Sequence, residues 1–385
     1  MEPLKGQLLV IVEDLTRHLY PWLSHRYKST NKIIRFQEDI EKSDETGIVM
    51  SVGRKQFPDA IHSIYTLHKI LKSKLPIEVH YCGERDLTAD MVEALMKMPN
   101  VKPVNLLEHF PQEIHVSEGW STKPYAILAS SFRTVILMDA DVRFFQPPEN
   151  ITSSSKIFDE YGLLFYHDRS IQRSMPDYAS WFKFINPQPT RYGSTLRYTN
   201  SLSYHEQESG VVIIDKSRIG ALHSLLLACA FNSFTYRSET YKHMYGDKET
   251  FWISWELLRV PYRFSPTYAG ALGVKTSDDT VCGNLFHVDE FLNPVWWNGG
   301  MWEVKEAKTR RVVQFEYLAF DSERDELKWF IEYQGAPHCL SVQDTKKDMR
   351  KLNADEKQLG ERYIQSFMME RELRWKKFVA KMLFV

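Results

Sequence analysis

The sequence lacks any apolar run that approaches the roughly 20 residues needed to span a bilayer. Its N-terminal apolar run, Leu8–Val12, ends at Glu13 and Asp14, and no small-residue cleavage site of a secretory signal follows it. We therefore predict no transmembrane segment in this chain.

The chain also lacks an excess of charge of either sign. Its 49 Lys and Arg residues nearly balance 50 Asp and Glu residues, which leaves a formal net charge of −1. Nucleic-acid-binding proteins usually present a strongly basic surface. We therefore predict no nucleic-acid partner.

Glycine-rich phosphate-binding fingerprints are missing as well. Neither the Walker pattern nor the dinucleotide-binding pattern occurs, and the run Gly53-Arg54-Lys55 matches neither. This absence argues against kinases and dehydrogenases. It favours a nucleotide whose phosphates are neutralised by a metal ion and by side chains.

Cysteine is scarce, with four residues that show no paired metal-ligand spacing: Cys82, Cys229, Cys282 and Cys339. Disulfides and buried thiols are both compatible with this pattern. Aromatic residues are plentiful at 13%. They suit the apolar faces of sugar rings, and they equally suit a large core.

Strand-like and helix-like segments alternate from Gly47 onward. Such alternation indicates βαβ units and a mostly parallel sheet, hence an α/β fold. The strand candidates are 47–53, 77–81, 101–106, 135–138, 162–166 and 210–214, with helical spacing over 61–71, 88–98, 125–132 and 219–231.

Three parts of the chain differ in composition. Residues 1–44 form a polar lead-in that we expect to be helical, and 45–300 contain the predicted strands and helices of a single domain. Residues 301–385 form a charged extension, in which Leu352, Leu359, Tyr363, Ile364 and Phe367 mark the apolar stripe of a helix. Within the middle part, 168–207 has little periodicity, and we interpret it as a long loop over the site.

A pair of carboxylates follows the buried strand candidate Val135–Met138. Asp139 and Asp141 are separated by Ala140, and ligands of open α/β sheets bind beyond the carboxyl ends of the strands. These carboxylates are placed to hold a divalent cation against a nucleotide diphosphate. An ordinary turn is the alternative, because Asp is common after strands.

Further carboxylates occur at two segment boundaries. Glu208 lies just before the strand candidate at 210–214, where a solvated turn is the alternative. Asp247 and Glu249 lie at the start of a predicted helix, and helix capping would also explain them.

Two more positions bear on a metal or phosphate site. His287 lies inside an apolar strand candidate, where it is either a satisfied core residue or a ligand. Asp139, Asp141 and an imidazole would suit Mn²⁺ or Mg²⁺ better than structural zinc. Gly299 and Gly300 would permit a close backbone approach to a phosphate, or they form an ordinary loop.

Together these blocks resemble the fungal α-mannosyltransferases of glycosyltransferase family 71. The resemblance covers about residues 45–300, and the runs that carry it are Gly47–Phe57, Trp120–Arg133, Asp139–Asp141, His205–Lys216, Gly246–Trp252 and Asn293–Gly300. It implies a GT-A fold, a GDP-mannose donor, Mn²⁺ (with Mg²⁺ possible) as cofactor, retention of anomeric configuration, and a Golgi-lumenal enzyme. Members of the family carry a type II membrane anchor, and we predict no such segment in this chain.

The resemblance also suggests roles for the residues. Asp141 would bind the metal, Asp139 the metal and the ribose, and His287 would be the third protein ligand. The predicted donor-binding residues are Val52, Gly53, Lys123, Asp139, Gly299 and Gly300. The predicted catalytic acids, which would hold the mannosyl hydroxyls, are Glu208, Asp247 and Glu249.

The predicted activity is therefore metal-dependent, retaining transfer of mannose from GDP-mannose to a mannose-containing glycan, in an α1,3 or α1,2 linkage. One alternative is a GT-A transferase that uses a UDP-sugar. Another is a glycan-binding scaffold of the same fold without catalytic activity.

Overall fold

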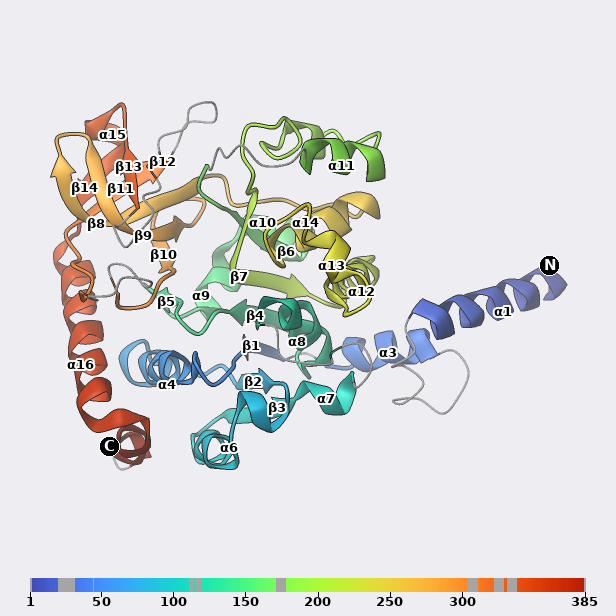
Figure 1. Ribbon diagram of the computed structural model, residues 1–385, viewed down its shortest axis with the longest axis horizontal. Helices are drawn as coiled ribbons and strands as arrows, with labels where there is room; N and C mark the ends of the chain where they lie inside the picture. The colour runs from blue at the N-terminus through green and yellow to red at the C-terminus, as the bar shows by residue number, and fades with distance from the viewer. Residues whose placement is uncertain are drawn as a thin grey trace.

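Two β-sheets organise the computed structural model, one in the middle of the molecule and one beside it (Figure 1). The structure describes residues 2–19, 32–43, 45–110, 114, 119–170, 178–302, 311–321, 329–330 and 338–383.

The central sheet has six strands in the order β3-β2-β1-β4-β7-β6. The first four are parallel, and β7 is antiparallel to both β4 and β6. This arrangement confirms the predicted α/β class with a mostly parallel, Rossmann-like sheet. The strands are β1 (Thr46–Ser51), β2 (Ile77–Tyr81), β3 (Val101–Asn105), β4 (Thr134–Met138), β6 (Leu163–His167) and β7 (Gln207–Asp215).

Both faces of this sheet are covered by helices. Val49 and Leu137 pack on one face with α8 (Lys123–Ala129), α12 (Ala221–Asn232) and α14 (Lys248–Leu257). Ile48 and Met138 pack on the other face with α4 (Phe57–Tyr65), α6 (Ala89–Met96) and the end of α16 (Ala354–Leu383). Burial on both sides explains why these strands are continuously apolar rather than alternating.

The order of the strands creates a switch point between β1 and β4. From β1 the chain proceeds through β2 to β3 on one side, and then returns to place β4 on the other side of β1. Connections that diverge in this way leave a crevice at the carboxyl ends of the two strands, where α/β proteins bind ligands. Asp139 directly follows β4 and therefore lies at this crevice.

The second sheet is antiparallel and was not predicted from the sequence. Its main path runs β12-β13-β9-β8-β11-β14, and β10 connects β9 to the short β5. Because β5 begins two residues after Asp141, this sheet abuts the predicted site. Its strands are β5 (Arg143–Phe144), β8 (Tyr268–Ser277), β9 (Thr280–Val288), β10 (Pro294–Trp297), β11 (Tyr317–Asp321), β12 (Trp329–Phe330), β13 (Cys339–Ser341) and β14 (Met349–Lys351).

The four cysteines adopt both of the states that the sequence left open. Cys282 and Cys339 form a disulfide between β9 and β13, across 57 residues of sequence. Cys82 and Cys229 are buried free thiols.

The remaining helices are short connections around the sheets. One of them, α11 (Tyr178–Ile185), lies in the segment 168–207 that was interpreted as a loop, so that interpretation is wrong for part of the segment. The others are α5 (Gly83–Asp86), α7 (Leu106–His109), α9 (Glu149–Ser154), α10 (Lys156–Tyr161), α13 (Arg237–Thr240) and α15 (Thr345–Asp348), together with a π-helical turn at Thr66–Ile70 and 3₁₀ turns at Gly119–Thr122 and Gly193–Thr195.

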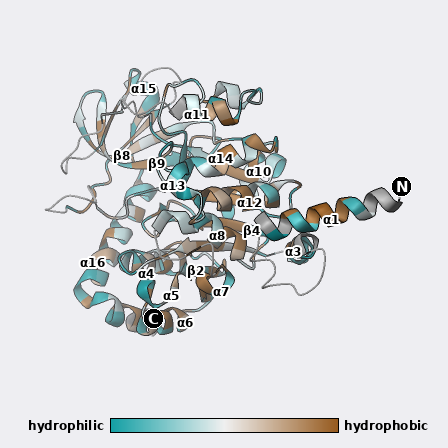
Figure 2. Ribbon diagram, turned by 45° about the vertical axis from the view of Figure 1, so that its right-hand side comes forward, coloured by the Kyte–Doolittle hydropathy of each residue, from teal (hydrophilic) through white to brown (hydrophobic). Residues whose placement is uncertain are grey.

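The chain begins with α1 (Glu2–Leu19) and α3 (Lys32–Glu41). Figure 2 shows α1 extending from the body with apolar residues along it, and Leu8, Val10, Ile11 and Leu15 are each more than half exposed. No helix within the described ranges is long and apolar enough to cross a membrane.

At the other end of the chain, α16 runs along the side of the molecule (Figure 1). Tyr363 and Phe367 are buried in a cluster with Trp297 and Leu318 of the second sheet. The five residues of the predicted stripe, Leu352, Leu359, Tyr363, Ile364 and Phe367, all contribute to this cluster. The last four lie on α16 and confirm its packed face, whereas Leu352 precedes the helix, so the prediction is wrong for that residue.

Candidate active site

The acidic pair lies in a tight turn at the end of β4. The backbone N–H of Asp139 donates to the carbonyl of Gly210 on β7 at 2.8 Å, and the N–H of Val142 donates back to the carbonyl of Asp139 at 3.0 Å. Asp141 is buried, and Asp139 is partly exposed. The turn therefore fixes both carboxylates at the switch point of the central sheet.

The buried guanidinium of Arg143 donates hydrogen bonds to the backbone of this turn. Its Nη1 donates to the carbonyl of Ala140 at 3.0 Å and to the carbonyl of Val142 at 2.7 Å. The hydroxyl of Ser63 on α4 donates to the same Ala140 carbonyl at 2.6 Å. Carbonyls that are paired in this way cannot rotate freely, so the backbone between the two acids is constrained.

His62 connects Arg143 to the C-terminal helix. Arg143 lies with Nη2 2.8 Å from His62 Nδ1, and His62 Nε2 lies 2.8 Å from the hydroxyl of Ser366 on α16. Burial and the positive charge of Arg143 lower the pKa of His62 well below its ordinary value. A neutral imidazole accepts at Nδ1 and donates at Nε2, which fits both contacts.

A buried ammonium group faces the acidic turn from the start of α8. Lys123 Nζ lies 2.8 Å from Asp139 Oδ1 and 3.7 Å from Asp247 Oδ2, and it donates to the Ser209 carbonyl at 3.1 Å. Burial alone would lower the pKa of Lys123, but Asp139 and Asp247 raise it above its ordinary value. Lys123 is therefore a permanent positive charge among carboxylates.

The carboxyl group of Asp139 is tuned by opposing effects. Burial raises its pKa, Lys123 lowers it, and the neighbouring charges of Asp141 and Asp247 raise it again, to about 6. Acids that face one another in this way retain protons more strongly than isolated acids. A cation that enters the turn would relieve this repulsion.

A second lysine–acid group lies at the start of β7. Lys248 Nζ is 2.7 Å from Asp168 Oδ2 and 3.3 Å from Glu208 Oε2. Glu208 also accepts hydrogen bonds from the backbone of Gly210, at 2.8 Å, and from the amide of Asn298, at 3.0 Å. Glu208 therefore connects β7 to the turn that follows β10.

That turn contains the predicted glycine pair. Gly299 and Gly300 have φ values of +100° and +64°, a region that favours glycine. The N–H of Gly300 donates to the carbonyl of Asp141 at 2.7 Å, and a Cβ on Gly300 would lie 3.5 Å from the Cβ of Asp141. The glycine pair thus lies directly against the acidic turn.

Asp247 and Glu249 have different surroundings. Asp247 precedes α14 but makes no side-chain capping bond, and its carboxylate faces Lys123. Glu249 is fully buried, accepting from the backbone N–H of Glu206 at 3.0 Å and from the indole N–H of Trp252. Burial raises the pKa of Glu249 to about 8, although these two hydrogen bonds oppose the rise.

His287 packs against aromatic rings. Its imidazole stacks on Trp296 with 4.1 Å between ring centroids and lies 5.1 Å from the ring of Tyr166. Burial lowers its pKa to about 3. Across the part of the chain that the structure describes, no three His, Cys, Asp or Glu side chains form a group that could hold a metal ion. Asp139, Asp141 and His287 are therefore not a preformed three-ligand site here.

Val52 and Gly53 lie at the end of β1. The N–H of Val52 continues the sheet by donating to the carbonyl of His80 at 2.9 Å. A Cβ on Gly53 would lie 3.4 Å from the carboxylate of Asp86, which is the last residue of α5, the short helix after β2. Both residues are therefore on the carboxyl edge of the sheet, on the β2 side of the switch point.

The structure thus brings Lys123, Asp139, Glu208 and Asp247 into one charged group with the glycine pair beside it, and it places Glu249 and His287 in packed surroundings. Asp168, Lys248 and Arg143 were not predicted as site residues from the sequence. Lys248 lay within a block that had been singled out, between two proposed acids. Asp168 lay at the end of a predicted strand, the same signal that identified Asp139.

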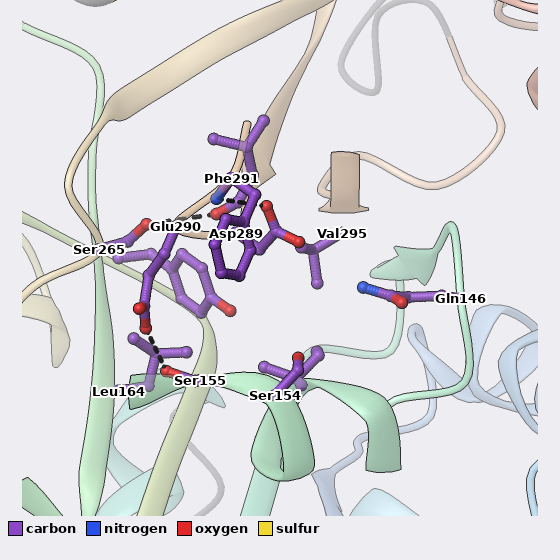
Figure 3. A pocket seen from close by; sticks show the side chains of 12 residues that line it. Gln146, Ser154, Ser155, Leu164, Ser265, Asp289, Glu290, Phe291 and Val295 are labelled. Atoms are coloured by element: carbon purple, nitrogen blue, oxygen red, sulfur yellow. Dashed lines mark hydrogen bonds between the residues drawn. The ribbon is translucent and has the colours of Figure 1, made fainter. Parts of the chain in front are cut away.

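A separate pocket opens between α9, α10 and the turn from β9 to β10 (Figure 3). Two of its acids already have hydrogen-bond partners. Glu290 accepts from the Ser155 hydroxyl at 2.7 Å and from the N–H of Ile157 at 3.0 Å, and Asp289 accepts from the N–H of Phe291 at 2.8 Å. The residues that line this pocket include none of Lys123, Asp139, Glu208 and Asp247, so it is separate from the charged group.

Comparison with known proteins agrees with the resemblance seen in the sequence. A family model described as "Mannosyltransferase putative" matches residues 45–289. The chain belongs to this mannosyltransferase family. The match includes the acidic turn, both lysine–acid groups and the strands of the central sheet.

Two fungal relatives illustrate the level of similarity. "Putative alpha-1,3-mannosyltransferase MNN14" of Candida albicans is 26% identical over 298 residues, covering 68% of this chain and 42% of the relative. "Alpha-1,3-mannosyltransferase MNN1" of Saccharomyces cerevisiae is 23% identical over 317 residues, covering 66% of this chain and 40% of the relative. The chain thus spans less than half the length of these two relatives.

Among solved structures, the chain is similar to core-mannan synthase A of Aspergillus fumigatus in its Mn/GDP form. The two are 12% identical, with a TM-score of 0.36, over 59% of this chain and 73% of that one.

Proposed function

We propose that this protein is a metal-dependent retaining mannosyltransferase that moves mannose from GDP-mannose to a mannose-containing glycan in an α1,3 linkage. One observation carries the proposal: two carboxylates and a buried lysine converge at the switch point of the sheet in a mannosyltransferase family member. The names of the fungal relatives support the linkage.

The residues present fit a divalent cation held chiefly by oxygen. Asp139 and Asp141 lie on either side of one residue in a constrained turn. Burial is the main cause of the raised pKa of Asp139, and the charges of Asp141 and Asp247 add a repulsion that a cation would relieve. Mg²⁺ is often bound by one or two carboxylates together with substrate phosphates, and Mn²⁺ also suits such oxygen ligands. We assign the cation to Asp139 and Asp141, with donor phosphates in place of a third protein ligand. When bound, such a cation stabilises the charge that develops on the departing diphosphate.

The remaining residues would hold the donor. Lys123 supplies a fixed positive charge for a phosphate, and the glycine pair, which lies against Asp141, leaves room for close backbone approach. Val52 and Gly53, at the end of β1, would lie beside the base. This arrangement would neutralise the phosphates without a glycine-rich fingerprint.

Glu208 and Asp247 are our candidates for holding the mannosyl hydroxyls and stabilising positive charge on the sugar. Asp247 Oδ2 lies 3.7 Å from Lys123 Nζ, and Glu208 Oε2 lies 3.3 Å from Lys248 Nζ. Glu249 is fully buried and accepts two N–H groups, so we assign it to positioning the segment that leads into β7. A Golgi-lumenal location, as in the resembling family, is part of the proposal.

Calorimetric titration of GDP-mannose and UDP-glucose, each with and without Mn²⁺, tests the proposal. We expect Mn²⁺-dependent binding of GDP-mannose alone. Asp141→Asn should abolish the metal dependence, while Asp278→Asn, which changes an exposed acid in the turn between β8 and β9, should not. Binding of UDP-glucose in preference to GDP-mannose, or an Asp141→Asn variant with unchanged Mn²⁺-dependent turnover, would contradict the proposal.

A further inference from the structure

Two large aromatic side chains are exposed side by side next to the charged group. Trp120 is 51% exposed and Tyr245 is 47% exposed. Their rings lie 5.3 Å apart, and the ring of His205 meets Tyr245 edge-on at 5.6 Å. Exposed aromatic surface costs free energy unless a partner covers it, and a cluster of such rings marks a binding surface. We call Trp120, Tyr245 and His205 the aromatic platform.

The platform is built by the same chain segments that build the charged group. Trp120 comes three residues before Lys123, and Tyr245 comes two residues before Asp247. His205 lies in the segment that leads to Glu208, with its Nδ1 3.9 Å from Glu249 Oε1. The platform therefore adjoins the segments that carry the buried lysine and acids.

The position of Trp120 depends on a glycine. Gly246 has φ +71°, and a Cβ there would lie 2.9 Å from Cε3 of Trp120. The indole therefore rests directly on the backbone between Tyr245 and Asp247. A side chain at position 246 would both strain the backbone and displace the ring.

Hydrogen bonds hold the short segment that carries Trp120. The guanidinium of Arg237 donates to the hydroxyl of Ser121 at 3.2 Å, and the hydroxyls of Thr122 and Ser51 are 2.6 Å apart. The Thr122 hydroxyl also donates to the carbonyl of Gly119 at 2.7 Å. The ring is thus exposed on a fixed backbone, which lowers the entropic cost of binding a ligand.

We propose that the aromatic platform binds a hexose ring of the acceptor glycan. A pyranose has an apolar C–H face that covers an aromatic ring, and its hydroxyls would reach the polar groups of His205 and the charged group beside it. The donor is assigned to the crevice at Lys123 and Asp139. The aromatic platform is an exposed surface near Asp247, and we assign it to the acceptor glycan. This proposal rests on the proposed mannosyltransferase function.

The test compares Trp120→Ala with Trp120→Phe and with the control Phe184→Ala, which removes a highly exposed aromatic ring on α11. Methyl α-mannopyranoside serves as the acceptor probe. We expect Trp120→Ala to raise the KM for this probe by about tenfold, with GDP-mannose binding unchanged. Trp120→Phe should restore part of the loss because it keeps an aromatic face, and Phe184→Ala should leave both values unchanged.

Quenching of tryptophan fluorescence by the same probe, measured without donor, separates this proposal from the proposed function. If quenching is lost in Trp120→Ala, the platform is supported even where GDP-mannose does not bind. An unchanged KM together with unchanged quenching in that variant would overturn it. So would a variant that weakens GDP-mannose binding and leaves the acceptor KM unaltered, since the platform would then belong to the donor.

Discussion

Lys123 Nζ lies within 2.8 Å of one carboxylate oxygen of Asp139 and 3.0 Å of the other. The lysine thus contacts both oxygens of an acid assigned to the metal. A cation bound there must share Asp139 with a permanent positive charge, so Lys123 opposes metal binding in the absence of donor and assists phosphate binding in its presence.

Replacing Lys123 should therefore change the Mn²⁺ affinity and the turnover in opposite directions. We expect Lys123→Met to tighten Mn²⁺ binding without donor by about tenfold, because the competing charge is removed. Turnover with GDP-mannose should fall by about 100-fold, because a phosphate loses its fixed counter-charge. Calorimetry and initial rates measure the two quantities.

Lys216→Met provides the matched control. Lys216 is also buried, and its Nζ donates to the carbonyls of Ile127 and Ser130. Its loss should reduce stability and leave Mn²⁺ affinity unchanged. Weaker Mn²⁺ binding in Lys123→Met would show that the lysine supports the metal site instead of competing with it.

The contacts of Arg143 predict that the C-terminal helix affects the acidic turn. We expect Ser366→Ala, which removes one hydrogen bond to His62, to cost about 1 kcal/mol of unfolding free energy. It should also weaken Mn²⁺ binding, because the chain from Ser366 through His62 to Arg143 holds the turn. Urea unfolding and Mn²⁺ titration measure the two effects.

Lys376→Met is the control for this chain of contacts, since Lys376 lies on the same helix and pairs with Asp90 at the surface. It should leave Mn²⁺ affinity unchanged. If Ser366→Ala loses stability but binds Mn²⁺ as tightly as the parent protein, α16 packs against the domain without positioning the acids.

The raised pKa of Glu249 predicts a pH-dependent stability. The ordinary value is 4.5 and the folded value is about 8, so between these limits the folded protein retains a proton that the unfolded chain has lost. Stability from this group is present below pH 4.5 and declines as the pH rises toward 8. We expect the free energy of unfolding to fall by several kcal/mol across this window.

Denaturant unfolding at pH 5 and pH 8 measures this decline. In Glu249→Gln the side chain no longer titrates, so the difference between the two pH values should shrink even if the variant is less stable at both. An identical difference in the two proteins would mean that Glu249 is ionised throughout the range.

The disulfide predicts a redox-dependent stability of the second sheet. We expect the double variant Cys282→Ser, Cys339→Ser to lose about 2–4 kcal/mol, because the bond closes a loop across 57 residues. Thermal unfolding with and without a reductant should show the same loss in the parent protein and none in the variant.

Cys82 should not react with a thiol reagent in the folded protein, since burial raises its pKa to about 12.

Much of the fold could be predicted because the relevant signals are local. The run Val135–Met138 is apolar on both faces, and it forms the β4 strand covered by helices on both sides. The stripe through Tyr363 and Phe367 likewise predicted the packed face of α16. Much of the second sheet escaped prediction because strands such as β13 and β14 are only three residues long and pair with partners that are distant in the sequence, as β13 does with β9.

The sequence by itself determined that two carboxylates follow a buried strand and that glycines and further acids accompany them in order along the chain. Only the tertiary structure decided which charges meet. Lys248 pairs with Asp168 across 80 residues, and His62 meets Ser366 across 304. It also placed Glu249 and His287 in packed surroundings rather than in the charged group. The physical reason is that strand and helix patterns arise from neighbours along the chain, whereas burial and pairing of a side chain depend on segments that only folding brings together.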